Sequence, residues 1–133
     1  MSNPSKVDLK TILIASGVAL VLLLQFGLKP YLHKRAAMKV VKTVLSNWAN
    51  KNLVRAIEQW ENRDESPPIY SLESYKILDY KAYKKDGVRY AEFKVLIKFL
   101  PGGVLPDNKE WVFILRDGHL GWKVFRFVLA ENV

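Results

Sequence analysis

Few side chains in this sequence are suited to acid–base, nucleophilic or metal chemistry. The chain has no cysteine and two histidines, His33 and His119, so a thiolate nucleophile and a multi-histidine metal site are both excluded. His119 lies in the sequence DGHLG, which is typical of a hairpin turn, and His33 lies beside two basic residues. We therefore predict no metal site and no catalytic role for either histidine.

Asp79 is the best candidate for a general base. It alternates with Tyr75, Ile77 and Tyr83 in a predicted strand, and a tyrosine could supply the proton donor that such chemistry needs. A solvated carboxylate opposite a lysine is the simpler interpretation, and a surface position is likewise favoured for Glu58. The sequence PGGV lacks the lysine and the hydroxyl residue of a phosphate-binding loop. We predict no catalytic residue, no cofactor and no enzymatic activity.

The chain that carries these residues begins with an apolar run, Thr11–Leu28, which has 18 residues and no charge. As a helix it would be ~27 Å long, close to the thickness of a bilayer core. We predict a transmembrane helix after a short tail of residues 1–10. The run is longer than the apolar part of a signal peptide, lacks a small-residue cleavage site and has no polar stripe of a buried helix. Pro30 is expected to limit continuation of the helix.

The chain is basic, with a net charge of +8, and part of the excess follows the apolar run at Lys29, Lys34, Arg35, Lys39 and Lys42. We predict that Lys29, Lys34 and Arg35 contact anionic lipid headgroups. This explains the cluster more simply than nucleic-acid binding, which we do not favour. The charge bias favours a cytoplasmic domain, but long domains cross membranes largely regardless of charge. The side of the membrane is therefore left open.

Two amphipathic helices are predicted next. In the segment Tyr31–Trp48, four large apolar residues recur at spacings of three and four, which places them on one face of a helix: Met38, Val41, Leu45 and Trp48. Asn50 or Asn52 can cap a second helix. That helix carries Leu53, Ile57 and Trp60 at helical spacing, and the proline-containing segment Glu61–Pro68 ends it.

The apolar period then changes to two, which predicts four strands: Tyr75–Lys84, Arg89–Leu100, Lys109–Arg116 and Trp122–Leu129. The pairs Asp86-Gly87 and Asp117-Gly118 are predicted to form hairpin turns. Helices followed by a meander of strands indicate an α+β domain with a curved antiparallel sheet over residues 29–133.

Seven apolar residues are predicted to be buried between the helices and the sheet: Trp48, Trp60, Phe93, Val95, Ile97, Trp111 and Phe113. The last strand does not fit a simple alternation, because Lys123 shares a face with Phe125 and Phe127. A β-bulge would resolve this conflict.

The layout resembles the nuclear transport factor 2-like superfamily, a cone-shaped α+β fold, over about residues 31–130. The features that match are the paired helices, the long antiparallel sheet and the segment Glu110–Phe127 (EWVFILRDGHLGWKVFRF), which looks like its last two strands. Enzymes of that superfamily use an Asp, His or Tyr inside the cone. Its membrane-anchored members include type IV secretion assembly factors and Mce-associated membrane proteins, and they are mostly scaffolding subunits. The resemblance implies a single-pass accessory subunit of a bacterial inner-membrane complex, and a tethered enzyme or ligand-binding domain is the alternative.

Two surfaces are predicted to bind other subunits of such a complex. Ala15 and Ala19 lie four residues apart in the apolar run and would allow another helix to approach closely. Tyr90 and Leu96 interrupt the polar face of the second strand and would form the apolar centre of a protein interface. A homo-oligomer formed through these surfaces is also left open.

Overall fold

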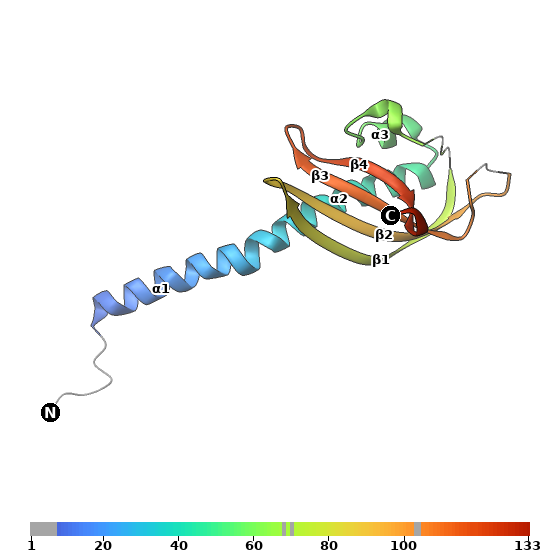
Figure 1. Cartoon of the computed structure of the whole chain (residues 1–133). Coiled ribbons are helices and arrows are strands. Elements are labelled where there is room, and N and C mark those ends of the chain that lie inside the picture. Colours follow the sequence, from blue (N-terminus) through green and yellow to red (C-terminus); the bar gives the residue numbers. More distant parts are fainter. Residues whose placement is uncertain (1–7, 68, 70, 103–104) are drawn as a thin grey trace. The chain divides into compact units, whose positions relative to one another are not determined.

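The structure of the protein is a computed structural model, and it describes residues 8–67, 69, 71–102 and 105–133. The chain divides into two compact units, Met1–His33 and Lys34–Val133. Within the described residues, the first unit is helical and the second combines helices with a four-stranded antiparallel sheet (Figure 1). The predicted α+β class is confirmed.

The apolar run forms α1 (Leu9–Leu23) and a π-helical segment, η1 (Leu24–Leu28), which leads directly into α2 (Lys29–Ala49). No side chain of α1 or η1 is buried. Among the described residues, Leu9–Ala49 is the one helix whose length and composition would allow it to cross a membrane.

The prediction that Pro30 limits continuation of the helix is wrong, because helical structure passes through it. A proline lacks the backbone N–H, and its ring would clash with the carbonyl four residues earlier, here that of Phe26. In this chain the turn before the proline, Leu24–Leu28, is π-helical. A π-turn shifts the hydrogen bonds by one residue, so the wider turn accommodates the ring.

In the second unit, α2 buries the face that the apolar spacing predicts. Val41, Leu45 and Trp48 are fully buried, and Met38 is half-buried against the same core. α3 (Leu53–Ile57) follows, and the side-chain oxygen of Asn52 accepts a hydrogen bond from the backbone N–H of Arg55 at its start. The predicted asparagine cap is therefore confirmed at Asn52.

The second helix is shorter than predicted and does not include Trp60. The backbone around Trp60 instead pairs in parallel with Val124. Val124 donates to the carbonyl of Gln59 (2.8 Å) and accepts from the N–H of Glu61 (2.9 Å). These two bonds and the burial of the Trp60 ring favour the extended bridge over another helical turn.

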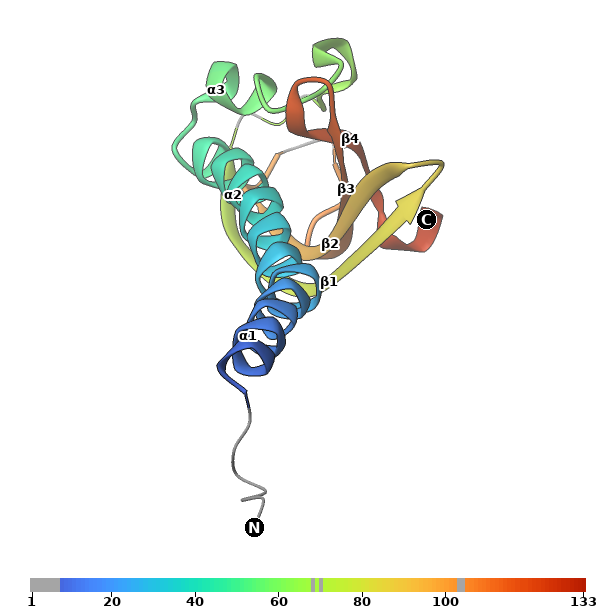
Figure 2. The same ribbon diagram turned by 90° about the vertical axis from the view of Figure 1, so that its left-hand side faces the viewer.

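The sheet has the order β1-β2-β3-β4, and all neighbours are antiparallel. Its strands are β1 (Leu72–Lys85), β2 (Val88–Phe99), β3 (Lys109–Gly118) and β4 (Gly121–Leu129). The four predicted strands are thus present, with β1 three residues longer at its start. α2 lies along one face of this curved sheet (Figure 2), and we call the opposite face the outer face.

The two hairpins differ in how well the sequence predicts them. Asp86 and Gly87 form the turn between β1 and β2, and both have positive φ angles, 52° and 79°. The predicted turn at Asp117-Gly118 is wrong, because these residues still pair with Trp122 and Gly121. The turn is formed two residues later, by His119 and Leu120, so His119 is an exposed turn residue as expected.

The predicted bulge in the last strand is present. The register changes from Ile114↔Arg126 to Leu115↔Val124, which leaves Phe125 as the extra residue of β4. Val124 and Phe127 consequently both face the core. All seven residues predicted to be buried are at most 5% exposed.

Candidate functional site

The space between α2 and the sheet is filled by aromatic rings. Trp48 lies 5.6 Å from Trp60 and 5.5 Å from Phe127, measured between ring centroids. Phe127 also stacks on Trp111 at 4.5 Å and lies 4.7 Å from Phe113.

The buried side chains of the described residues include no charged or polar residue. Two polar atoms inside the core lack a hydrogen-bond partner, the indole Nε1 atoms of Trp48 and Trp111. An N–H donor that is buried without an acceptor costs free energy. Among the described residues, no three His, Asp or Glu side chains are placed to hold a metal ion together.

Asp79 does not lie in this interior. A register shift between Ile77 and Asp79 makes Leu78 a bulge residue, so Asp79 lies on the outer face opposite Lys94. The predicted alternation with Tyr75 and Ile77 is therefore wrong, because the bulge reverses the order of faces. The Asp79 side chain is exposed and accepts a hydrogen bond from the N–H of Tyr80 (2.8 Å). This is the solvated carboxylate of the simpler interpretation.

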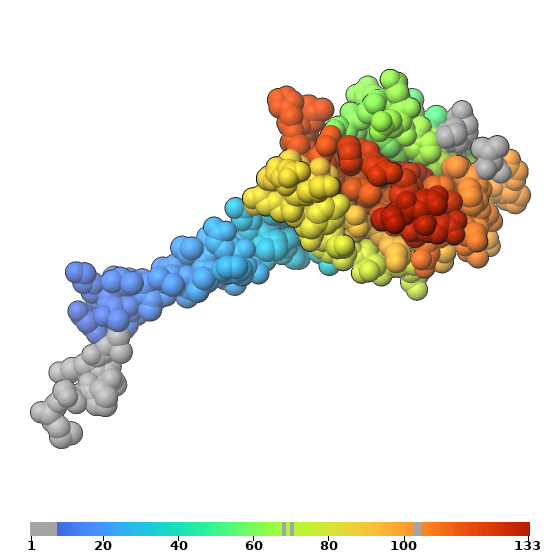
Figure 3. All heavy atoms as spheres, viewed as in Figure 1, coloured from blue at the N-terminus to red at the C-terminus, as the bar shows by residue number. Residues whose placement is uncertain are grey.

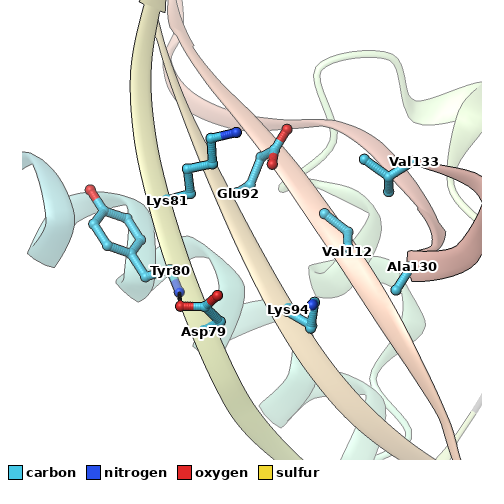
Figure 4. A pocket seen from close by; sticks show the side chains of 8 residues that line it. All are labelled: Asp79, Tyr80, Lys81, Glu92, Lys94, Val112, Ala130 and Val133. Carbon is cyan, nitrogen blue, oxygen red and sulfur yellow. Dashed lines mark hydrogen bonds between the residues drawn. The ribbon is translucent and has the colours of Figure 1, made fainter.

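Asp79 borders a shallow hollow of about 340 Å³ on the outer face (Figure 4). Lys81, Glu92 and Lys94 point to this side of the sheet, whereas the Tyr80 ring points to the other side. Tyr80 packs on Phe93 at 5.0 Å, and burial raises the pKa of its hydroxyl. The hollow therefore carries both signs of charge without a buried acid or base.

A polar cluster on the outer face surrounds Arg116. Its Nε donates to Glu61 Oε2 (2.8 Å), and a second guanidinium nitrogen donates to Glu61 Oε1. The guanidinium carbon lies 4.1 Å from the centre of the Phe125 ring. The hydrogen bond from Arg116 lowers the pKa of the Glu61 carboxyl, and the bond to Glu61 raises the pKa of Arg116. The bulge at Phe125 and the bridge at Trp60 bring these groups together.

Tyr90, one of the predicted partner-binding residues, adjoins this cluster. Its ring stacks on Tyr83 (5.3 Å) and meets Phe125 edge-on (6.2 Å). The Tyr83 hydroxyl donates a hydrogen bond to the Glu92 carboxylate (3.1 Å). Burial is the largest cause that raises the pKa of Tyr83, and the Glu92 carboxylate is the next. Tyr90 is half-buried, less exposed than a free strand face would predict, because these neighbours cover it.

Leu96, the other predicted contact, lies in a second hollow of the outer face, also of about 340 Å³. It is half-buried. The hollow is lined by Leu96, Asn108, Lys109, Glu110, Leu129, Ala130 and Glu131. Three apolar side chains with a charged rim form a small recess that an apolar side chain of a partner could enter.

Sequence reasoning missed two apolar residues of this face. Val112 and Ile114 point away from α2, yet they are only 5% and 8% exposed. The segment Ala130–Asn132 packs against β3 on this face, and its residues lie over the sheet in Figure 3. The signal was the unbroken apolar sequence WVFIL, since a strand that is buried on both faces does not alternate.

The predicted lipid-contacting residues lie on two units. Lys29 belongs to the first unit, whereas Lys34 and Arg35 begin the second, and all three are exposed. The Lys34 ammonium lies 5.0 Å from the centre of the Tyr80 ring. Ala15 and Ala19 are exposed in α1, as a helix-packing surface requires.

No protein-family model, curated protein or solved structure matches this chain. The resemblance to the nuclear transport factor 2-like superfamily therefore stays a prediction.

Proposed function

We propose that this protein is a single-pass membrane protein whose second unit is a non-catalytic accessory or assembly subunit of a membrane complex. The observation that carries the proposal is the helix Leu9–Leu28, which exposes apolar side chains over its whole surface. Such a surface is costly in water and favourable in a bilayer. A bacterial inner membrane is the setting that the superfamily resemblance implies.

The interior of the second unit supports association rather than catalysis. Proton abstraction needs a base in a site that substrate can enter. Here Trp48, Trp60 and Phe127 pack together at 5.5–6.5 Å between ring centroids, and Asp79 lies on the opposite face of the sheet. The recess beside Leu96 offers a partner a place to dock instead.

A tethered ligand-binding domain is the second candidate. The observation in its favour is the pair of buried indole N–H groups of Trp48 and Trp111, which have no acceptor. A small ligand with hydrogen-bond acceptors would satisfy them. If the domain binds such a ligand, addition of the ligand should change the tryptophan fluorescence and raise the unfolding temperature of the protein.

Replacing Leu96 by Asp tests the accessory function. The charge would enter the recess, so the variant should lose at least about 1 kcal/mol of binding to its membrane partner, a loss typical of an interface residue that matters. The measurement is the yield of the intact complex after extraction in mild detergent. The exposed Val54 of α3 provides the matched control, because Val54→Asp adds the same charge elsewhere.

The far-UV circular dichroism of both variants should match that of the wild type. If Leu96→Asp unfolds the second unit, Leu96 is a structural residue and the proposed docking surface is wrong. Equal complex yields for both variants would also contradict it. Loss of a measurable turnover in Asp79→Asn would contradict the non-catalytic role.

A further inference from the structure

The exposed side of α2 carries a groove whose charges are not balanced within the chain. It is lined by Arg35, Met38, Lys39, Lys42, Thr43, Ser46 and Asn47, with a volume of about 650 Å³. The whole helix Lys29–Ala49 has no acidic residue. In the described part of the chain, the ion pairs are Lys98–Glu73 and Arg116–Glu61. The three cations of the groove therefore have no carboxylate partner there.

The groove also offers hydrogen-bonding groups beside its charges. The Thr43 hydroxyl donates to the carbonyl of Lys39 (2.7 Å), and the Asn47 amide donates to the carbonyl of Thr43 (2.7 Å). Both bonds run along the helix, so they hold these two side chains close to its surface. Met38 adds an apolar contact. The single hydroxyl proton of Thr43 is used in its bond to Lys39, whereas the Asn47 amide keeps a second N–H. Three cations, one amide donor and one apolar group suit a phosphodiester with a glycerol backbone.

We propose that the α2 groove, with Lys39 and Lys42 at its centre, binds the phosphate of an anionic phospholipid. This rests on the proposed membrane anchoring, and it extends the predicted lipid contacts beyond Lys29, Lys34 and Arg35. Clusters of four to eight basic residues immediately on the cytoplasmic side of a membrane helix are typical of anionic-lipid binding, so the proposal takes the second unit to be cytoplasmic, the side that the charge bias favours. Five basic residues follow Leu28 within 14 positions here, which favours lipid over a protein or a nucleic acid as the occupant.

The experiment compares two double variants of the full chain in mild detergent. Lys39→Ala/Lys42→Ala removes two charges from the groove, and Lys84→Ala/Lys85→Ala removes two exposed lysines of β1. Each protein is mixed with equal amounts of phosphatidylglycerol and phosphatidylcholine, and the retained lipids are counted by native mass spectrometry. One lysine near an anionic membrane surface strengthens binding to that surface by about five-fold. The wild type and the β1 variant should prefer phosphatidylglycerol, and the groove variant should lose at least about five-fold of this preference.

Three results would overturn the proposal. The wild type could show no preference, the two variants could lose it equally, or inorganic phosphate at millimolar concentration could displace the lipid and identify the groove as a free-phosphate site. Alkaline carbonate extraction of the groove variant tests the anchoring separately. If this variant stays in the membrane pellet, the lipid proposal can fail while the proposed anchoring still holds. Unchanged thermal unfolding of the groove variant is expected, since its two lysines are exposed.

Discussion

At the scale of single residues, the ion pair between Glu61 and Arg116 is the contact that responds to pH. The hydrogen bond from Arg116 lowers the pKa of the folded Glu61 carboxyl below its usual 4.5. Its stabilisation is therefore fully present above about pH 4.5 and is lost as the pH falls through the folded pKa. The pair is about one third exposed, so we expect a contribution of about 0.2–1 kcal/mol.

Glu61→Gln should remove this contribution. The free energy of unfolding, measured by denaturant titration, should differ between variant and wild type at pH 7, and the difference should shrink at pH 3. Glu110→Gln is the control, because Glu110 is exposed and has no ion pair among the described residues. A difference that stays constant from pH 7 to pH 3 would contradict the assignment.

Trp111 tests the aromatic core. Its ring stacks on Phe127 at 4.5 Å and meets Phe99 edge-on at 6.3 Å. Trp111→Ala should cost about 3–5 kcal/mol in the free energy of unfolding, because it leaves a cavity. Trp111→Phe should cost clearly less, since it keeps a ring and removes an N–H that has no acceptor. A loss below about 1 kcal/mol for the alanine variant would show that the ring is not part of the core.

At the scale of the elements, the sequence predicts periodicity well and backbone irregularity poorly. The spacing of Val41, Leu45 and Trp48 and the alternation in β2 are local patterns that the fold preserves. The bulge at Leu78 leaves no comparable pattern in the sequence. The residues of β1 are so mixed in polarity that either set of alternate residues could face the core. The position of Asp79 therefore could not be predicted. The bulge at Phe125 was predictable because a lysine conflicted with two phenylalanines.

The two Asp-Gly pairs show the same limit for turns. Gly87 has a φ of +79°, which a residue with a side chain adopts at a cost. Gly118 lies in β3 without a positive φ, and the nearest atom to an added methyl group is 4.0 Å away. The dipeptide is the same in both places, and only the register of the flanking strands decides which one turns.

Gly87→Ala should consequently lower the free energy of unfolding by about 1 kcal/mol. Gly118→Ala should change it by less than about 0.5 kcal/mol, as for an ordinary surface substitution. Denaturant titration of both variants in the same detergent provides the comparison. Equal losses would mean that the turn between β3 and β4 also depends on a glycine at position 118.

At the scale of the whole molecule, the first unit needs apolar surroundings, whereas the second does not. The α1 and η1 segments bury none of their side chains, whereas the Lys34–Val133 unit has its own buried core. A unit with a core can fold in water, and an apolar helix without one needs a bilayer or another protein. In the proposed function, the first unit anchors the protein and the second binds its partners.

Membrane integration is tested by charging the helix. The wild type should stay in the membrane pellet after alkaline carbonate extraction. Val18→Arg/Leu22→Arg should move it to the supernatant, because each arginine near the centre of a membrane helix costs about 2.5–3.5 kcal/mol on the insertion scale. Leu120→Arg places the same residue in the exposed β3–β4 turn and should stay in the pellet. Release of the wild-type protein would contradict membrane integration.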